Sequence, residues 1–310
     1  MSKQRDDVPM IRSLSPAARI LGPSTSATLR PLLRRGFAPR RRALALVGGA
    51  LGQCAAGTSV HQTTLGGVPV EIATPPRYAG AASIVYLHGG AYVALAPRGY
   101  RRLVTRLALA TGCRVVAVDY RLAPEHPYPA ALEDAVAVCT AERAERPHEK
   151  FVIAGDSAGG GLTVATAIAL RDRGYELPAA LICISPWVDL TCSGDSVTTR
   201  ARQERILSPA GLAADARLYA GAEQLDSPTV SPLFADLSGL PPMMIQVGDD
   251  EVLLDDATRL ADAARHAGVT VSLQFWPRLW HVWHLYAGLL PEADAAMRAI
   301  ADFVHEPSAS

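Results

Sequence analysis

A Gly-Asp-Ser-Ala-Gly segment at residues 155–159 has the Gly-x-Ser-x-Gly spacing that can hold a nucleophilic serine. An apolar run at 151–154 leads into it, and a stretch rich in small residues at 158–170 leads out of it. A strand, a sharp turn and a helix form the arrangement that a nucleophile elbow requires. The flanking glycines let the backbone turn without Cβ clashes, so we expect Ser157 in a strained conformation with its hydroxyl above a sheet. The competing interpretation is a glycine-rich turn with a surface serine.

A second glycine pair could stabilise the oxyanion that forms when a serine attacks a carbonyl group. His88, Gly89, Gly90 and Ala91 follow the apolar residues 84–87. Backbone N–H groups in such a loop can point together at a developing oxyanion, and the N–H of Ala158 would add a further donor. Since the loop lies about seventy residues before the Gly-x-Ser-x-Gly segment, it indicates the other half of an oxyanion hole rather than a simple turn.

A serine hydroxyl also needs a base within hydrogen-bond reach and an acid that orients the base. In enzymes with this kind of elbow the chain order is serine, acid, histidine. That order selects Asp249, Asp250 or Glu251 as the acid and His281 or His284 as the base. Both segments follow expected strands, at the sheet edge where ligands bind. Four other histidines lie far from such loops, and we expect them to face solvent: His61, His148, His266 and His305.

Seven short apolar runs alternate with helix-like segments from about residue 64 onward. This alternation predicts an α/β fold with a mostly parallel sheet covered by helices on both faces. The expected strands are residues 68–73, 84–87, 115–118, 152–154, 181–184, 243–247 and 271–275. Residues 1–60 and 192–222 break the alternation, and we expect helices outside the sheet there.

The composition is that of an ordinary globular chain. Of the 310 residues, 49% are hydrophobic and 19% are charged, which excludes a disordered chain. The formal net charge is +0, so no long-range field would attract nucleic acid. The five cysteines are odd in number and show no Cys-x-x-Cys spacing, so neither a disulfide framework nor a zinc site is indicated. We therefore expect a reducing compartment and a cytoplasmic protein. Arg40, Arg41 and Arg42 precede an apolar run that is too short to span a bilayer, and we expect a helix there rather than an export signal.

Several longer motifs resemble one family. The segments 119–131 (DYRLAPEHPYPAA), 88–92 (HGGAY) and 155–161 (GDSAGGG) closely resemble the bacterial hormone-sensitive-lipase-like esterases, also called family IV carboxylesterases of the α/β-hydrolase fold. Further matches lie at 231–233 (SPL), at 239–242 (GLPP) and in the His281 loop. The resemblance covers roughly residues 60–305, and the first sixty residues match only loosely.

The resemblance implies Ser157 as the nucleophile, His281 as the base, and backbone donors at Gly89, Gly90 or Ala91 together with Ala158. The chain departs from the family at three points. Its His-Gly-Gly-Ala replaces the usual His-Gly-Gly-Gly, which matters only if the fourth residue needs a positive φ. A gapless match puts Glu251 where the family's acid is usually aspartate; Asp250 is the alternative one residue away, and we favour Glu251. His284 is an additional histidine to which the resemblance gives no role.

The resemblance also implies a helical cap over an α/β-hydrolase core. Residues 1–60 would form N-terminal cap helices, 192–222 a cap insertion, and 61–191 with 223–310 the core. The cap would shape a pocket lined by apolar side chains, which we expect to include Trp187, Leu207 and Trp283. Asp156, Glu125 and His126 would hold the loops beneath the site through hydrogen bonds.

The implied activity is hydrolysis of short- to medium-chain carboxylic esters through an acyl-enzyme, with no metal or cofactor. An amidase or a lactonase would use the same residues. A non-catalytic ligand receptor of this fold would lack the histidine that is present here as His281. The expected partner is a small-molecule ester, without nucleic acid or stable membrane insertion, and a homodimer is left open.

Overall fold

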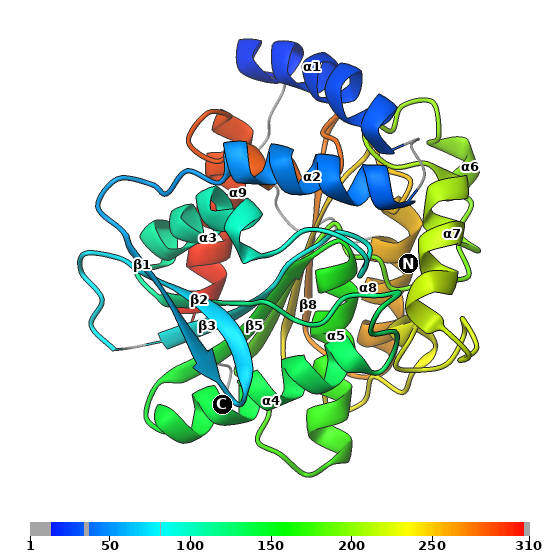
Figure 1. The fold of residues 1–310 in the computed structure, drawn as a ribbon. Helices are drawn as coiled ribbons and strands as arrows, with labels where there is room; N and C mark the ends of the chain where they lie inside the picture. Colours follow the sequence, from blue (N-terminus) through cyan, green and yellow to red (C-terminus); the bar gives the residue numbers. More distant parts are fainter. Residues whose placement is uncertain (1–13, 34–36, 81, 307–310) are drawn as a thin grey trace.

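The computed structural model describes residues 14–33, 37–80 and 82–306, and a central sheet runs through them with helices on both faces (Figure 1). In spatial order the strands are β1 (Ser59–Leu65), β2 (Val68–Thr74), β4 (Arg114–Val118), β3 (Ala82–Leu87), β5 (Lys150–Asp156), β6 (Ala180–Ile184), β7 (Met243–Gly248) and β8 (Val271–Trp276). β1 pairs with β2 and β2 with β4 in antiparallel fashion, whereas the remaining neighbours are parallel. The α/β fold expected from the sequence is therefore confirmed.

All seven strands expected from the sequence are present, each within two residues of its expected bounds. The eighth strand, β1, was not expected. It lies at an edge of the sheet, it is mostly polar, and of its residues only Leu65 is buried. No hydrophobic pattern therefore marks it as a strand.

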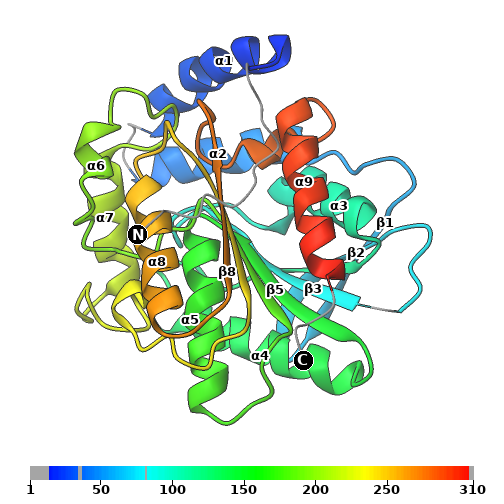
Figure 2. The same ribbon diagram turned by 180° about the vertical axis from the view of Figure 1, so that it is seen from behind.

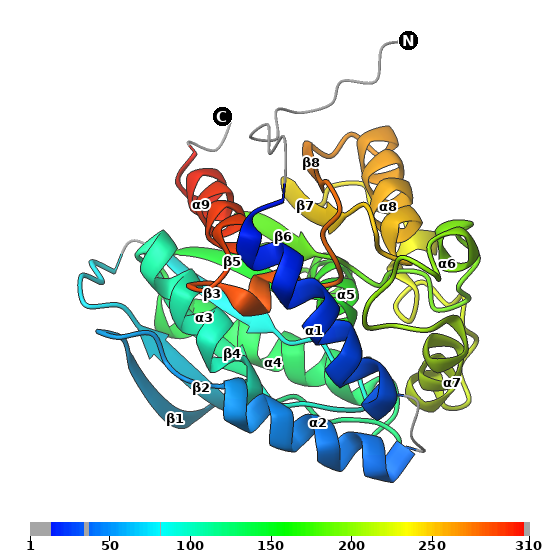
Figure 3. The same ribbon diagram turned by 90° about the horizontal axis from the view of Figure 1, so that it is seen from above.

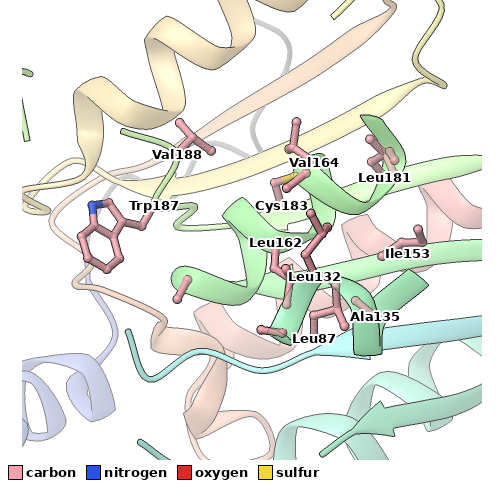
Figure 4. Packing of buried hydrophobic residues seen from close by; sticks show 14 of the residues in the cluster. Leu87, Leu132, Ala135, Ile153, Leu162, Val164, Leu181, Cys183, Trp187 and Val188 are labelled. Carbon is pink, nitrogen blue, oxygen red and sulfur yellow. The ribbon is translucent and has the colours of Figure 1, made fainter. Parts of the chain in front are cut away.

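Two apolar cores lie on opposite faces of the sheet, because successive side chains of a strand point to opposite sides. In β3, Val85 and Leu87 belong to one core, and Ile84 and Tyr86 belong to the other. The first core packs against α4 (Ala130–Glu145), α5 (Ala158–Asp172) and α8 (Leu254–His266), and Figure 4 shows part of this packing around Leu162 of α5. The second packs against α3 (Pro97–Thr111) and α9 (Pro291–His305), which lie together on the other face (Figure 2). Burial on both faces is typical of a parallel sheet.

Among the described residues, four further α-helices lie outside the sheet layers: α1 (Pro16–Leu33), α2 (Phe37–Leu51), α6 (Ser196–Thr199) and α7 (Pro209–Ala220). Figure 3 shows α1 crossing over the sheet, with α6 and α7 on the side of α8. The helices expected within residues 1–60 and 192–222 are thus present, and the basic run at Arg40 to Arg42 lies inside α2. Residues 1–13, part of the first of these regions, lie outside the described residues. Among the described helices, none is both long and apolar enough to cross a membrane.

Candidate active site

Ser157 occupies a strained turn between β5 and α5. Its φ and ψ are 55° and −123°. Residues other than glycine rarely adopt this combination, so the surrounding structure must enforce it. A Cβ added at Gly155 would lie 2.2 Å from the Gly159 carbonyl oxygen, and one at Gly159 would lie 1.9 Å from that of Leu87. Gly155 and Gly159 are therefore needed, because a side chain at either position would collide with a backbone carbonyl group. The strained turn that the spacing predicts is present.

His281 lies within hydrogen-bond distance of both Ser157 and an acid. Its Nε2 is 2.9 Å from the Ser157 Oγ, and its Nδ1 is 2.8 Å from Glu251 Oε2. A carboxylate can only accept, so Nδ1 carries a proton and Nε2 is left to accept from the serine hydroxyl. Burial disfavours the imidazolium, but the hydrogen bond and charge of Glu251, with smaller contributions from other carboxylates, leave the pKa of His281 above its ordinary value. This protonation pattern is the one that a general base needs.

The loop after β7 holds Glu251 in a fixed orientation. Its side chain is fully buried, and Oε1 accepts hydrogen bonds of 2.7 Å each from the Ser185 hydroxyl and the Gly248 N–H. Asp250 instead lies 3.7 Å from Arg205, and Asp249 accepts from the backbone N–H of Arg278. Of the three adjacent acids, Glu251 is therefore the one that reaches His281, as the gapless register predicts.

His284 is occupied in a separate buried network. Its Nε2 lies 2.8 Å from Gln246 Oε1, and the Gln246 amide donates in turn to Gln274 and to the Ala296 carbonyl. Burial lowers the pKa of His284 to about 3. The ring therefore braces the loop that carries His281 and does not compete for the role of base. The four histidines expected to face solvent are all exposed: His61, His148, His266 and His305.

The loop after β3 is attached to the elbow through Asp156. This buried carboxylate accepts hydrogen bonds from the hydroxyls of Tyr86 (2.7 Å) and Tyr100 (2.9 Å) and from the Gly89 N–H (3.0 Å). Burial raises the pKa of Asp156 to about 6, although both tyrosines oppose the rise. Asp156 thus holds the loop as expected, with two tyrosines that no sequence motif singled out.

The Gly89 N–H is consequently committed to Asp156, so it is not free to donate to an oxyanion. Within the described part of the chain, the N–H groups of Gly90, Ala91 and Ala158 make no hydrogen bond to the protein. Ala91 has a φ of 55°, which is the case in which alanine in place of glycine is strained. Of the four N–H groups that the sequence suggests as oxyanion donors, those of Gly90, Ala91 and Ala158 are therefore available and that of Gly89 is not.

Glu125 and His126 do not lie beneath the site, contrary to the expectation from the sequence. Both are exposed. The Glu125 carboxylate instead binds Arg41 of α2, with N–O distances of 2.6 and 2.7 Å. Glutamate and histidine occur both in surface ion pairs and in buried hydrogen bonds that hold loops, so their identity alone did not show which of the two they form here.

A cavity that opens to solvent reaches Ser157 and His281, and the empty space within it and its open mouth amounts to about 880 Å³. Its wall is mostly apolar and is formed by Leu29, Leu44, Val93, Ala94, Leu95, Ile206, Leu207, Leu212, Val282 and Leu285, together with Arg40, Gly90, Ala91, Tyr100, Asp156, Ser208, Gly211 and Asp215. Leu207 lines it as expected. Trp187 and Trp283 do not, because both are fully buried in the two cores. Apolar character alone did not show on which side of the cavity wall these rings lie.

Glu204 is a buried carboxylate that no sequence motif indicated. It connects the cavity wall to the loop that carries Glu251. It accepts hydrogen bonds from the N–H groups of Ile206 (2.8 Å), Leu207 (3.2 Å) and Val252 (3.2 Å). Val252 directly follows Glu251, whereas Ile206 and Leu207 line the cavity. Burial raises the pKa of Glu204, while the charge of His281 opposes the rise. A single isolated glutamate between α6 and α7 carried no motif that could have revealed this contact.

Metal ligands are not grouped in this site. Among the described residues, no cluster of three histidine, cysteine, aspartate or glutamate side chains is placed to hold a metal ion. All five cysteines lie in the described ranges, and each is free.

Comparisons with known proteins identify the family. Residues 84–285 match the family model described as alpha/beta hydrolase fold. The chain is 45% identical over 242 residues to an acetyl-hydrolase of Streptomyces hygroscopicus, an alignment that covers 78% of this chain and 81% of that protein. It superposes on an esterase from the bacterial hormone-sensitive lipase family with a TM-score of 0.88 and 37% identity, covering 95% of this chain and 99% of that one. It also superposes on the crystal structure of EstE5 soaked with p-nitrophenyl butyrate. That superposition has a TM-score of 0.89 and 36% sequence identity, and it covers 96% of this chain and 100% of that one.

These matches span most of the chain, and the motifs at 88–92, 119–131 and 155–161 lie inside the region that the family model covers. The elbow, the loop after β3 and the segments of Glu251 and His281 lie in it as well. The chain therefore belongs to the α/β-hydrolase family and, within it, to the hormone-sensitive-lipase-like family IV carboxylesterases.

Proposed function

We propose that the protein is a serine carboxylesterase that hydrolyses short- to medium-chain esters through an acyl-enzyme on Ser157. Ester hydrolysis is the activity of its family. The observation that carries the proposal is the hydrogen-bonded series Ser157, His281 and Glu251 at the wall of a mostly apolar cavity. A cytoplasmic location and a homodimer stay predictions from the sequence.

The reaction begins when Ser157 Oγ attacks the ester carbonyl carbon and His281 Nε2 takes the hydroxyl proton. The carbonyl oxygen becomes an oxyanion, to which the N–H groups of Gly90, Ala91 and Ala158 would donate. His281 then gives its proton to the leaving alcohol as the carbon–oxygen bond breaks. Water attacks the acyl-enzyme with His281 again as the base, which releases the acid and restores the Ser157 hydroxyl. Glu251 accepts from Nδ1 throughout and stabilises the imidazolium.

The mostly apolar wall of the cavity supports a preference among acyl chains. Each methylene that enters the apolar wall contributes about 0.8 kcal/mol until the wall ends. We therefore expect acetyl to hexanoyl p-nitrophenyl esters to be preferred over long-chain lipids, without activation at an oil–water interface. Initial rates on this series and on emulsified triolein measure the preference. Faster turnover of triolein than of a butyrate ester would contradict it.

Glu204 should influence the pH dependence of the reaction through its charge. In Glu204→Gln the amide oxygen can still accept from Ile206 and Leu207, whereas the bond from the Val252 N–H is lost. A negative charge that favours the imidazolium is lost as well. The pKa of His281 should fall, so the acid limb of the kcat/KM profile should move to lower pH. Glu251 and Asp156 also raise this pKa, and both stay in place.

The control for this measurement is Glu223→Gln, which removes an exposed carboxylate just after α7. Its acid limb should coincide with that of the unmodified protein. An unshifted limb in Glu204→Gln, at a retained melting temperature, would restrict Glu204 to a purely structural role.

A further inference from the structure

One ion pair interrupts the apolar wall of the active-site cavity. Arg40 of α2 and Asp215 of α7 line the same cavity as Ser157, and their side chains are bonded to each other through Arg40 Nη2 and Asp215 Oδ1. Relative exposure is 8% for Arg40 and 6% for Asp215. The pair therefore brings two charges into a largely desolvated place where the other side chains of these two helices are leucines, Leu44 and Leu212.

The pair leaves hydrogen-bonding capacity unused. A guanidinium has five N–H donors and a carboxylate has two acceptor oxygens. Within the described part of the chain, Arg40 makes its side-chain hydrogen bond through Nη2 alone, and Asp215 Oδ2 accepts none. Arg101 and Glu71, outside the cavity, join instead through two bonds of 2.7 and 2.8 Å. None of these free atoms is among the buried, unpartnered atoms of the described residues, so solvent reaches them in the cavity. A polar group of a substrate that displaces this solvent can therefore bind Arg40 and Asp215.

Stability does not explain why this pair is present. Replacing a buried ion pair by hydrophobic side chains of similar size is often neutral or stabilising. Burial raises the pKa of Asp215, and Arg40 only partly offsets this effect. Leucine at both positions would extend the apolar wall without desolvating any charge.

We propose that Arg40 and Asp215 form a polar subsite for an uncharged group that both accepts and donates hydrogen bonds, a hydroxyl or an amide, on the chain of the ester substrate. The group would accept from Arg40 and donate to Asp215 Oδ2. The pair is neutral overall, so it favours such a group over a carboxylate. This substrate class rests on the proposed esterase function, and it predicts discrimination because a substrate without the group leaves the pair unsatisfied.

Matched esters test the subsite in the unmodified protein. The acyl side is probed with methyl butanoate, hexanoate and octanoate and their terminal-hydroxy counterparts, and the alcohol side with the corresponding alkyl and hydroxyalkyl acetates. Acid release at constant pH gives kcat/KM for each ester. At the chain length that reaches the pair, the hydroxy ester should exceed its alkyl partner by about tenfold, the contribution of one hydrogen bond to a charged group. The monomethyl ester of the matching dicarboxylic acid should fall below the hydroxy ester.

The double variant Arg40→Leu/Asp215→Leu removes the pair without leaving one charge buried alone. Its ratio of hydroxy to alkyl ester should fall about tenfold, partly because the alkyl ester gains an apolar wall. The matched control is Arg41→Leu/Glu125→Leu, which removes the adjacent ion pair of α2 outside the cavity. That control should keep the hydroxyl preference.

Three results would overturn the subsite: no hydroxyl preference at any length on either side, a preference that survives in the Arg40→Leu/Asp215→Leu variant, or a carboxylate ester that exceeds the hydroxy ester. The comparison in the unmodified protein needs no variant, so the absence of a hydroxyl preference there overturns the subsite even if the double variant does not fold. A protein that hydrolyses none of these esters would instead contradict the proposed function itself.

Discussion

Ser157→Ala should lower the kcat of ester hydrolysis by about four to six orders of magnitude, because it removes the hydroxyl on which the proposed acyl-enzyme forms. The variant keeps the Cβ, the strained turn and the hydrogen bond of His281 to Glu251. The melting temperature should therefore stay close to that of the unmodified protein. Rates on p-nitrophenyl butyrate and a thermal melt measure both properties.

The matched control for this variant is Ser238→Ala, which changes an exposed serine in the loop before β7. It should retain full activity. If purified Ser157→Ala keeps more than a few per cent of the activity, Ser157 is not the nucleophile.

Glu251→Gln should cost up to about four orders of magnitude in kcat, as loss of the orienting acid does in a well-studied triad. The amide oxygen can keep the bonds to Ser185 and Gly248, which turns the amide nitrogen toward His281 Nδ1. The imidazole is then driven to carry its proton on Nε2, where it cannot accept from Ser157. The imidazolium of the transition state also loses its counter-charge.

Asp250→Asn is the matched comparison, since Asp250 is adjacent and lies near Arg205 rather than His281. It should cost less than about tenfold, because its charge can act only through a partly solvated field. The reverse ranking would transfer the role of acid to Asp250. Equal and small losses would mean that neither residue is the acid. A native melting temperature must accompany each rate before the two variants are compared.

The strands of the sheet were predictable where burial on both faces requires a continuous run of apolar residues. The interior strands are apolar along their whole length because helices cover both faces, so runs such as 84–87 and 181–184 revealed them. The edge strand β1 is mostly polar and contains no such apolar run. The spatial order, in which β4 lies between β2 and β3, depends on pairing between distant segments and could not be derived from the local patterns.

The candidate site was predictable to the extent that it is encoded in short motifs. The elbow around Ser157 and the loop at His88 have fixed spacings, and the gapless register selected Glu251. The braces of these loops come from distant elements: Tyr86 and Tyr100 on Asp156, and Glu204 on the segment of Val252. No spacing links such residues, so only the folded chain brings them together.

The cavity wall was the least predictable part of the site. Trp187 and Trp283 were wrong as lining residues because hydrophobicity predicts burial but not which buried side chains border a cavity. Arg40 and Asp215, in contrast, are charged residues on two helices distant in sequence. A charged side chain is normally expected at the surface, so their place in the wall could be found only from the structure.

Covalent labelling tests the central claim most directly. The protein is treated with a fluorophosphonate at neutral pH, digested, and analysed by mass spectrometry. We expect one stoichiometric adduct on Ser157, complete loss of esterase activity in parallel with labelling, and no adduct in Ser157→Ala. An unlabelled protein, or an adduct on another residue while Ser157 stays free, would contradict the assignment of Ser157 as the nucleophile.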